Sequence, residues 1–145
     1  MIPRATWVAT LLGYEGTPYA HQGRLPGVGL DCIGPPICAA KALGLKDAGF
    51  DISDYTRQPD GSLMPYLDAH LMRKPRAELA LGDVVLNAFR LGKPQHIAVI
   101  VGELYGEWVM LHANSITGRV ERERIQYARR FYRYVQGYAV PGVGP

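Results

Sequence analysis

The residues most able to do chemistry in this chain are a cysteine and a set of histidines. Cys32 lies in the stretch GVGLDCIGPPICAAKALG, between Asp31 and a Gly-Pro-Pro sequence, directly before an expected helix. A thiol at a helix N-terminus is stabilised as a thiolate by the helix dipole and by unpaired amides of the first turn. We therefore expect Cys32 to act as a nucleophile, which requires a base. The candidate bases are the four histidines of the chain, His21, His70, His96 and His112.

Two of these histidines lie on expected strands. His96 opens the apolar segment HIAVIVG and His112 lies in WVMLHAN, joined to it through ELYGE. If the two strands pair so that opposite residue numbers add up to 208, the histidines face each other directly, whereas a slip of one residue sends them to opposite faces. In the favourable register Cys32 would attack a carbonyl, His96 would take and return the proton, and His112 would hold the tautomer of His96.

A zinc site is the competing chemical hypothesis. Cys32, His21, His96 and His112 could supply four ligands, but no short Cys-x-x-Cys or His-Glu-x-x-His spacing supports them, so we expect no metal and no cofactor. Each residue also has an ordinary structural interpretation. We expect Cys38 to pack in the core without a disulfide to Cys32, and His70 to lie on the surface.

The composition and breaker residues indicate the elements that must position these groups. With 145 residues, 48% of them hydrophobic, the chain is expected to form one domain, residues 1–145. We predict a helix over 5–13, and a second from Cys32 or Ile33 to Leu43 that starts at Pro35 and Pro36.

The second half of the chain predicts a sheet. A turn-rich insertion covers about 46–80 and includes a short helix in LMPYLDAHLMRK. The segments 82–89, 96–114 and 118–140 then show β-branched and aromatic alternation broken by Gly-bearing turns, which is typical of a meandering antiparallel sheet. Helices followed by strands predict an α+β fold, with the nucleophile helix packed on one face of the sheet.

Charge and hydropathy narrow the partners. The net charge is +3, and arginines gather near the C-terminus, which favours a solvated surface or a protein contact over a nucleic-acid face. These arginines are Arg119, Arg122, Arg124, Arg129, Arg130 and Arg133. We see neither a signal peptide nor an apolar run long enough to span a membrane, so we expect the protein to be made in the cytoplasm.

Four separated blocks resemble a known family, the NlpC-type cell-wall cysteine peptidases, which have a papain-like α+β fold. The blocks are GTPYAHQGRLPGVGLDCIG, LALGDVVLNAF, QHIAVIVG and MLHANS, in family order. The resemblance implies that Cys32 is the nucleophile, His96 the general base and His112 the residue that orients it. It also implies that the Cys32 amide donates to the oxyanion, and that Tyr19, Asp31 and His21 bind substrate or oxyanion.

Within this family the chain is similar to short members encoded among tail genes of bacteriophages and gene transfer agents. The shared features are the PY.HQ loop and the insertion DYTRQPDGSLMPYLDAHL. This resemblance implies a virion protein of the tail tip, assembled in the host cytoplasm, whose partners are the peptidoglycan stem peptide and other tail-tip or baseplate proteins. Ile33 replaces a family serine and Pro35 replaces an apolar residue, which keeps open an inactive structural component of the tail. An acyltransferase or thioesterase, with a wide apolar groove, is a third alternative.

Overall fold

Six antiparallel strands form the main sheet of the computed structural model, which describes residues 1–145. The spatial order is β4-β9-β5-β6-β7-β8, so β9 inserts between two earlier strands. Their bounds are β4 Met72–Lys74, β5 Val84–Phe89, β6 Pro94–Leu104, β7 Glu107–Asn114, β8 Arg119–Arg124 and β9 Tyr132–Ala139.

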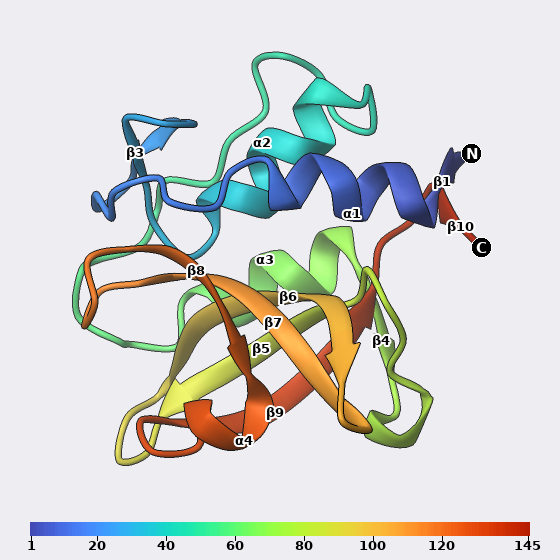
Figure 1. The fold of residues 1–145 in the computed structure, drawn as a ribbon. Helices are drawn as coiled ribbons and strands as arrows, with labels where there is room; N and C mark the ends of the chain where they lie inside the picture. The colour runs from blue at the N-terminus through green and yellow to red at the C-terminus, as the bar shows by residue number, and fades with distance from the viewer.

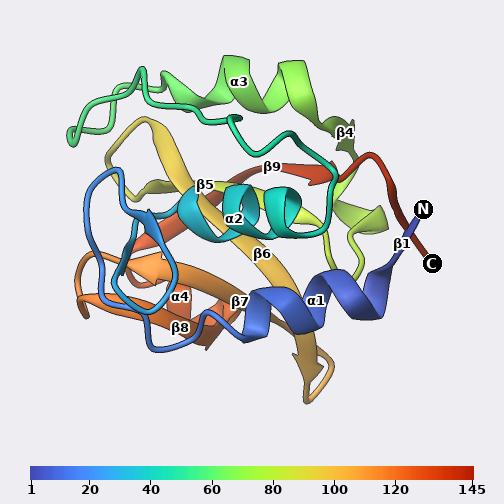
Figure 2. The same cartoon turned by 90° about the horizontal axis from the view of Figure 1, so that it is seen from above.

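The three longest helices gather on one side of this sheet (Figures 1 and 2). They are α1 Arg4–Leu12, α2 Gly34–Ala42 and α3 Leu63–His70, with a 3-10 turn η1 at Arg76–Glu78 and a short α4 at Ile125–Ala128 below the sheet. The chain ends meet, because β1 (Ile2–Pro3) pairs in parallel with β10 (Val143–Gly144). A small hairpin, β2 (Arg24–Leu25) and β3 (Gly29–Leu30), precedes the Cys32 segment. No helix has the length and apolar character needed to cross a membrane.

Alternation along the strands divides the core between the two faces of the sheet. Ile97 and Val99 of β6 belong to the large cluster that also contains Trp7 of α1 and Ile37 of α2. The intervening Ala98 points to the other face, where a smaller cluster forms around α4. The prediction of helices combined with an antiparallel sheet, with the helix that follows Cys32 on one face of that sheet, is confirmed.

Two predicted elements differ from the structure. The helix expected in LMPYLDAHLMRK ends at His70, and Met72–Lys74 instead pair with β9 as an edge strand. The segment 118–140 is not continuous strand, because α4 interrupts it. The chain must cross from β8 at one edge to β9 beyond β5, and α4 makes that crossing while filling the face of the sheet away from α1 and α2.

The β6–β7 hairpin does not have the register, with paired numbers that add up to 208, in which His96 and His112 would face each other directly. A two-residue turn at Tyr105 and Gly106, both with positive φ, sets Leu104 opposite Glu107, so paired numbers add up to 211. A β-bulge at Val101 then changes the sum to 210, with Ile100 opposite Met110. The sum of 208, which would set His96 directly opposite His112, is therefore not the one that forms, and it differs by two residues from the sum next to the histidines. Because two is even, both histidines still point to the same face; the unbulged sum of 211 would have separated them.

Candidate active site

Cys32 lies in a turn immediately before α2, and the first turn of that helix has few free N–H groups to stabilise a thiolate. The N–H of Gly34 donates to the carboxylate of Asp31 at 3.2 Å, and the next two residues, Pro35 and Pro36, have no N–H. The unpaired first-turn amides that the sequence analysis expected to stabilise a thiolate are thus missing from these three positions. Stabilisation of the thiolate by the helix terminus is correspondingly weakened.

The thiol of Cys32 packs against the start of β6. Its Sγ donates to the main-chain carbonyl of Gln95 at 3.4 Å. Gln95 is the extra residue of a second bulge, since His96 pairs with Asn87 while Pro94 pairs with the adjacent Ala88. Burial, and secondarily the charge of Asp31, raise the pKa of Cys32 to about 12. The resting group is therefore a neutral thiol at physiological pH.

Behind Cys32, two histidines and a glutamate form a buried chain of hydrogen bonds. Nε2 of His96 lies 2.8 Å from Nδ1 of His112, and Nε2 of His112 lies 3.0 Å from Oε2 of Glu123. His112 is fully buried, and its hydrogen bond is the main factor that lowers the pKa of Glu123. An ionised carboxylate only accepts, so His112 donates from Nε2 and accepts at Nδ1. His96 must then carry its proton on Nε2, which leaves a lone pair on Nδ1.

The imidazole of His96 is held from two sides and is neutral. Its ring stacks on Tyr132 with centroids 4.1 Å apart, and the Tyr132 hydroxyl donates to Oδ1 of Asn114 at 3.2 Å. Burial, followed by repulsion from His112, lowers the pKa of His96 well below its usual value. Nδ1 makes no hydrogen bond within the chain, so it is the nitrogen available to accept a proton.

Five of the six predicted site residues line one small pocket, of about 60 Å³. These are Tyr19, His21, Asp31, Cys32 and His96, and the sixth, His112, lies directly behind His96. Burial, and then the charges of Cys32 and Asp31, raise the pKa of Tyr19 to about 12, so its hydroxyl remains a donor. His21 meets the ring of Tyr55 edge-on, with centroids 5.6 Å apart. A wide apolar groove, as expected for an acyltransferase, is not what surrounds Cys32.

Asp31 lines the pocket, but its carboxylate is bonded within the chain and so is not free to bind substrate, which the sequence analysis expected of it. Its side chain is 1% exposed, and four donors occupy the four lone-pair directions of its carboxylate. These donors are the N–H groups of Gln22 and Gly34, Nη1 of Arg24 and the hydroxyl of Tyr55. With no acceptor position left for a substrate amine, Asp31 ties the β2–β3 hairpin to the start of α2.

Glu123 is the site residue that the sequence analysis missed. The segment RVERER was interpreted only as strand and basic surface, although β8 pairs with β7 and sets Glu121 opposite His112. An acid beside a strand histidine was the available signal. In the alternative zinc set His112 has no free ligand atom, because both of its ring nitrogens are hydrogen-bonded within the chain. The residues that do come together as possible ligands are His112, Glu121 and Glu123.

Comparisons with known proteins bear on the fold. No family model matches the chain, and no curated protein matches it. Among solved structures, the fold is similar to that of a lipoprotein-like protein of the NLP/P60 family from Staphylococcus aureus subsp. aureus Mu50, with a TM-score of 0.63 and 18% identity. The match covers 94% of this chain and 41% of that one, so this chain spans about two fifths of that protein's length. The chain therefore has an NlpC-like fold.

Because the thiol of Cys32 and the imidazole of His96 are both neutral, we predict slow alkylation of Cys32. Iodoacetamide labelling, followed by mass spectrometry against pH, is expected to be much slower at pH 7 to 8 than for a free thiol of pKa about 8.5, and to rise only as pH approaches 12. The variant His96→Ala should label at a similar rate, because the imidazole carries no charge to stabilise a thiolate. Fast labelling below pH 8 that disappears in His96→Ala would instead indicate a preformed thiolate–imidazolium pair.

Proposed function

We propose that the protein is a cysteine peptidase that cleaves an amide bond in the peptide part of peptidoglycan. The observation that carries this proposal is the oriented chain from His96 through His112 to Glu123, which frees Nδ1 of His96 in the pocket that contains Cys32. A carboxylate–imidazole–imidazole relay that fixes one tautomer is the arrangement that a general base requires.

The reaction that this geometry supports starts from a neutral pair. As Sγ of Cys32 attacks the carbonyl carbon, its proton moves to Nδ1 of His96. The C–N bond breaks when the amine nitrogen takes that proton, which leaves a thioester. Water then attacks the thioester while Nδ1 accepts a water proton, and the carboxylic product leaves as the thiol is restored. Each time Nδ1 accepts a proton, His96 becomes an imidazolium that Glu123 stabilises through His112.

The test is to trap the thioester. The protein is incubated with purified peptidoglycan, quenched in acid and digested, and the Cys32 peptide is weighed by mass spectrometry while released amino groups are counted. We expect a peptidyl adduct on Cys32, none on Cys38, and amino groups that increase with time. Release of amino groups with no adduct would point to another mechanism, and no release at all would contradict the proposal.

Tyr19 is expected to stabilise the oxyanion. Its hydroxyl makes no hydrogen bond within the chain and stays protonated, and the Cys32 N–H is likewise unpaired, so both can donate to a developing oxyanion. We expect Tyr19→Phe to lower kcat about 100-fold with little change in KM. Equal losses in kcat for Tyr19→Phe and for a change at the more distant Tyr66→Phe would argue against this role.

The place of action that we propose is the tail tip of a phage or gene-transfer particle, where the protein would open the cell wall for genome delivery. The support is the sequence resemblance of the PY.HQ loop and of the insertion at about 46–80. Immunogold labelling of purified particles, compared with host lysate, tests it directly. Label at the tail tip is expected, and label confined to the lysate would place the protein elsewhere.

A second candidate function is a structural component of the tail tip that retains the fold with little activity. The observation that favours it is the first turn of α2, where Gly34, Pro35 and Pro36 leave no free N–H for a thiolate. Under this alternative Cys32→Ala particles would assemble and infect normally. Loss of infection with normal assembly would favour the enzyme.

A further inference from the structure

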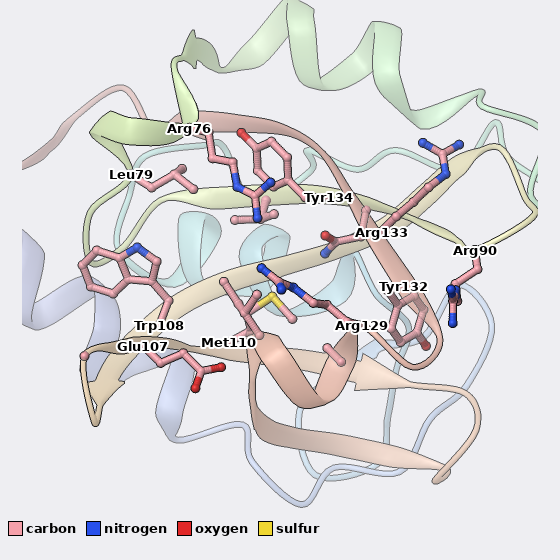
Figure 3. Close-up of a pocket in the computed structure, with 15 residues that line it drawn as sticks. Arg76, Leu79, Arg90, Glu107, Trp108, Met110, Arg129, Tyr132, Arg133 and Tyr134 are labelled. Carbon is pink, nitrogen blue, oxygen red and sulfur yellow. The ribbon is translucent and has the colours of Figure 1, made fainter.

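A large cleft opens on the face of the sheet opposite α1 and α2, away from Cys32. Its volume is about 560 Å³, and its floor is apolar, with Val85 of β5 and Met110 of β7 among the lining residues (Figure 3). Leu79 and Trp108 lie toward one end of it, and Arg90 toward the other. The cleft is large enough for a ligand to bind in extended form.

Three arginines from separate parts of the chain reach this floor: Arg76, Arg90 and Arg129. None of them forms an ion pair, whereas Arg133, between Tyr132 and Tyr134 on β9, turns its guanidinium away from the floor and donates to the carbonyl of Gly92, at 3.0 Å. The remaining arginines of the C-terminal cluster behave differently, since each is paired with a carboxylate. These pairs are Arg119 with Glu121, Arg122 with Glu15, Arg124 with Glu107, and Arg130 with Glu123. Within the C-terminal cluster, an arginine with neither an ion pair nor a turn away from the floor is found only at the cleft, namely Arg129.

A buried donor without an acceptor lies in the same cleft. Asn87 is 4% exposed, and its Nδ2 is the single buried side-chain polar atom of the chain that lacks a hydrogen-bond partner. Leaving such a group unsatisfied is costly, and native proteins keep few of them. An acceptor oxygen bound in the cleft would satisfy it.

The chemistry of the lining favours carboxylates over nucleic acid. Single-stranded nucleic acid stacks its bases on open aromatic faces. Here two of the rings in the cleft are already covered, since the guanidinium of Arg76 lies 4.6 Å from the centroid of Tyr134 and Tyr132 stacks on His96. Unpaired arginines beside apolar and aromatic side chains are instead typical of protein interfaces, where guanidinium groups bind carboxylates in pairs of hydrogen bonds.

We propose that this cleft is the docking site for an acidic segment of a partner polypeptide, whose carboxylates pair with Arg76, Arg90 and Arg129 while an apolar side chain packs on Trp108 and Met110. The acceptor that reaches Asn87 is an oxygen of that segment. The site is independent of the peptidase proposal, because none of its arginines contacts Cys32 or His112. It shares one wall with the catalytic region, since Tyr132 lines the cleft and stacks on His96.

The experiment is an NMR titration of the isotope-labelled protein with a short peptide that alternates glutamate and leucine. We expect the side-chain amide of Asn87 and the indole N–H of Trp108 to shift in a saturable manner, while the indole of the buried Trp7 does not. The same peptide with glutamine in place of glutamate, and an oligothymidylate of matching charge, should cause no saturable shift. A stronger response to the oligothymidylate would overturn the proposal in favour of a nucleic-acid site, and no response to either would remove the docking site.

Matched variants separate the site from general charge effects. The double variant Arg90→Ala/Arg129→Ala should lower the affinity for the peptide about tenfold or more. The double variant Arg119→Ala/Arg122→Ala removes the same charge from β8 and should leave the affinity within about twofold of the parent. Asn87→Leu should raise the melting temperature of the free protein but lower its affinity for the peptide, because it removes an unsatisfied donor that the bound peptide would satisfy. Equal effects of the two arginine pairs, or tighter binding by Asn87→Leu, would contradict the proposal.

Discussion

Cys32→Ala is expected to abolish hydrolysis of purified peptidoglycan, with no residual activity above the uncatalysed rate. The substitution removes the only thiol of the pocket, and the hydroxyl groups that also line it, on Tyr19, Thr56 and Ser115, cannot form a thioester. Because Cys32 is half-buried and its Sγ makes one weak hydrogen bond, the fold should survive. Turbidity loss of a peptidoglycan suspension and circular dichroism of the variant measure the two effects.

The second cysteine provides the control for this prediction. Cys38 is also free and half-buried, and its Sγ donates to the carbonyl of Arg24 at 3.3 Å, but it lies inside α2 away from the pocket. Cys38→Ala should therefore keep nearly full activity. Hydrolysis by Cys32→Ala at the rate of the parent protein would rule out the thiol mechanism whatever Cys38→Ala does.

Asp31→Ala is expected to lower the free energy of unfolding by about 3–5 kcal/mol, the usual cost of removing one member of a buried ion pair. The carboxylate accepts from four donors, and its loss leaves Arg24 with one charged partner and the N–H of Gln22 without its acceptor. Urea denaturation at pH 7, monitored by tryptophan fluorescence, gives the value. The β2–β3 hairpin should also lose protection in hydrogen exchange.

Asp51 offers a matched comparison, because its carboxylate also pairs with Arg24, at 2.8 Å, but it is 42% exposed. An exposed pair is screened by solvent, so Asp51→Ala should cost at most about 1 kcal/mol. If the two variants lost similar stability, the buried position of Asp31 would not be what matters. A stable Asp31→Ala that loses activity with a raised KM would return this residue to the list of candidates for substrate binding.

Much of the fold could be predicted because local signals and tertiary structure agree. Pro35 and Gly44 bracket a helix that forms within two residues of the predicted ends, and the alternation in HIAVIVG marks β6. Where the two disagree, tertiary pairing decides. The apolar spacing of Leu63, Leu67 and Leu71 predicts a longer helix than α3, yet the backbone of Met72–Lys74 gains ladder hydrogen bonds with β9.

The site was predictable in its members but less so in its electrostatics. Cys32, His96 and His112 could be named from residue type and spacing, and the structure brings them together as the chain of hydrogen bonds requires. The charge state of Cys32 could not be predicted, because it depends on burial and on the charge of Asp31, and no local sequence pattern reports either effect. Glu123 was missed for a related reason, since its approach to His112 depends on the pairing of β8 with β7.

The single extra residue at Val101 makes the candidate site sensitive to the length of the β6–β7 hairpin rather than to its composition. Side chains in a strand alternate with a period of two, so the two histidines share a face by parity. Deleting or inserting one residue between them would reverse that parity, whereas changing the length by two would restore it. Many substitutions in the exposed turn at Tyr105 should therefore be tolerated, while one-residue length changes there should not. Viable homologues are expected to differ in this hairpin by even steps.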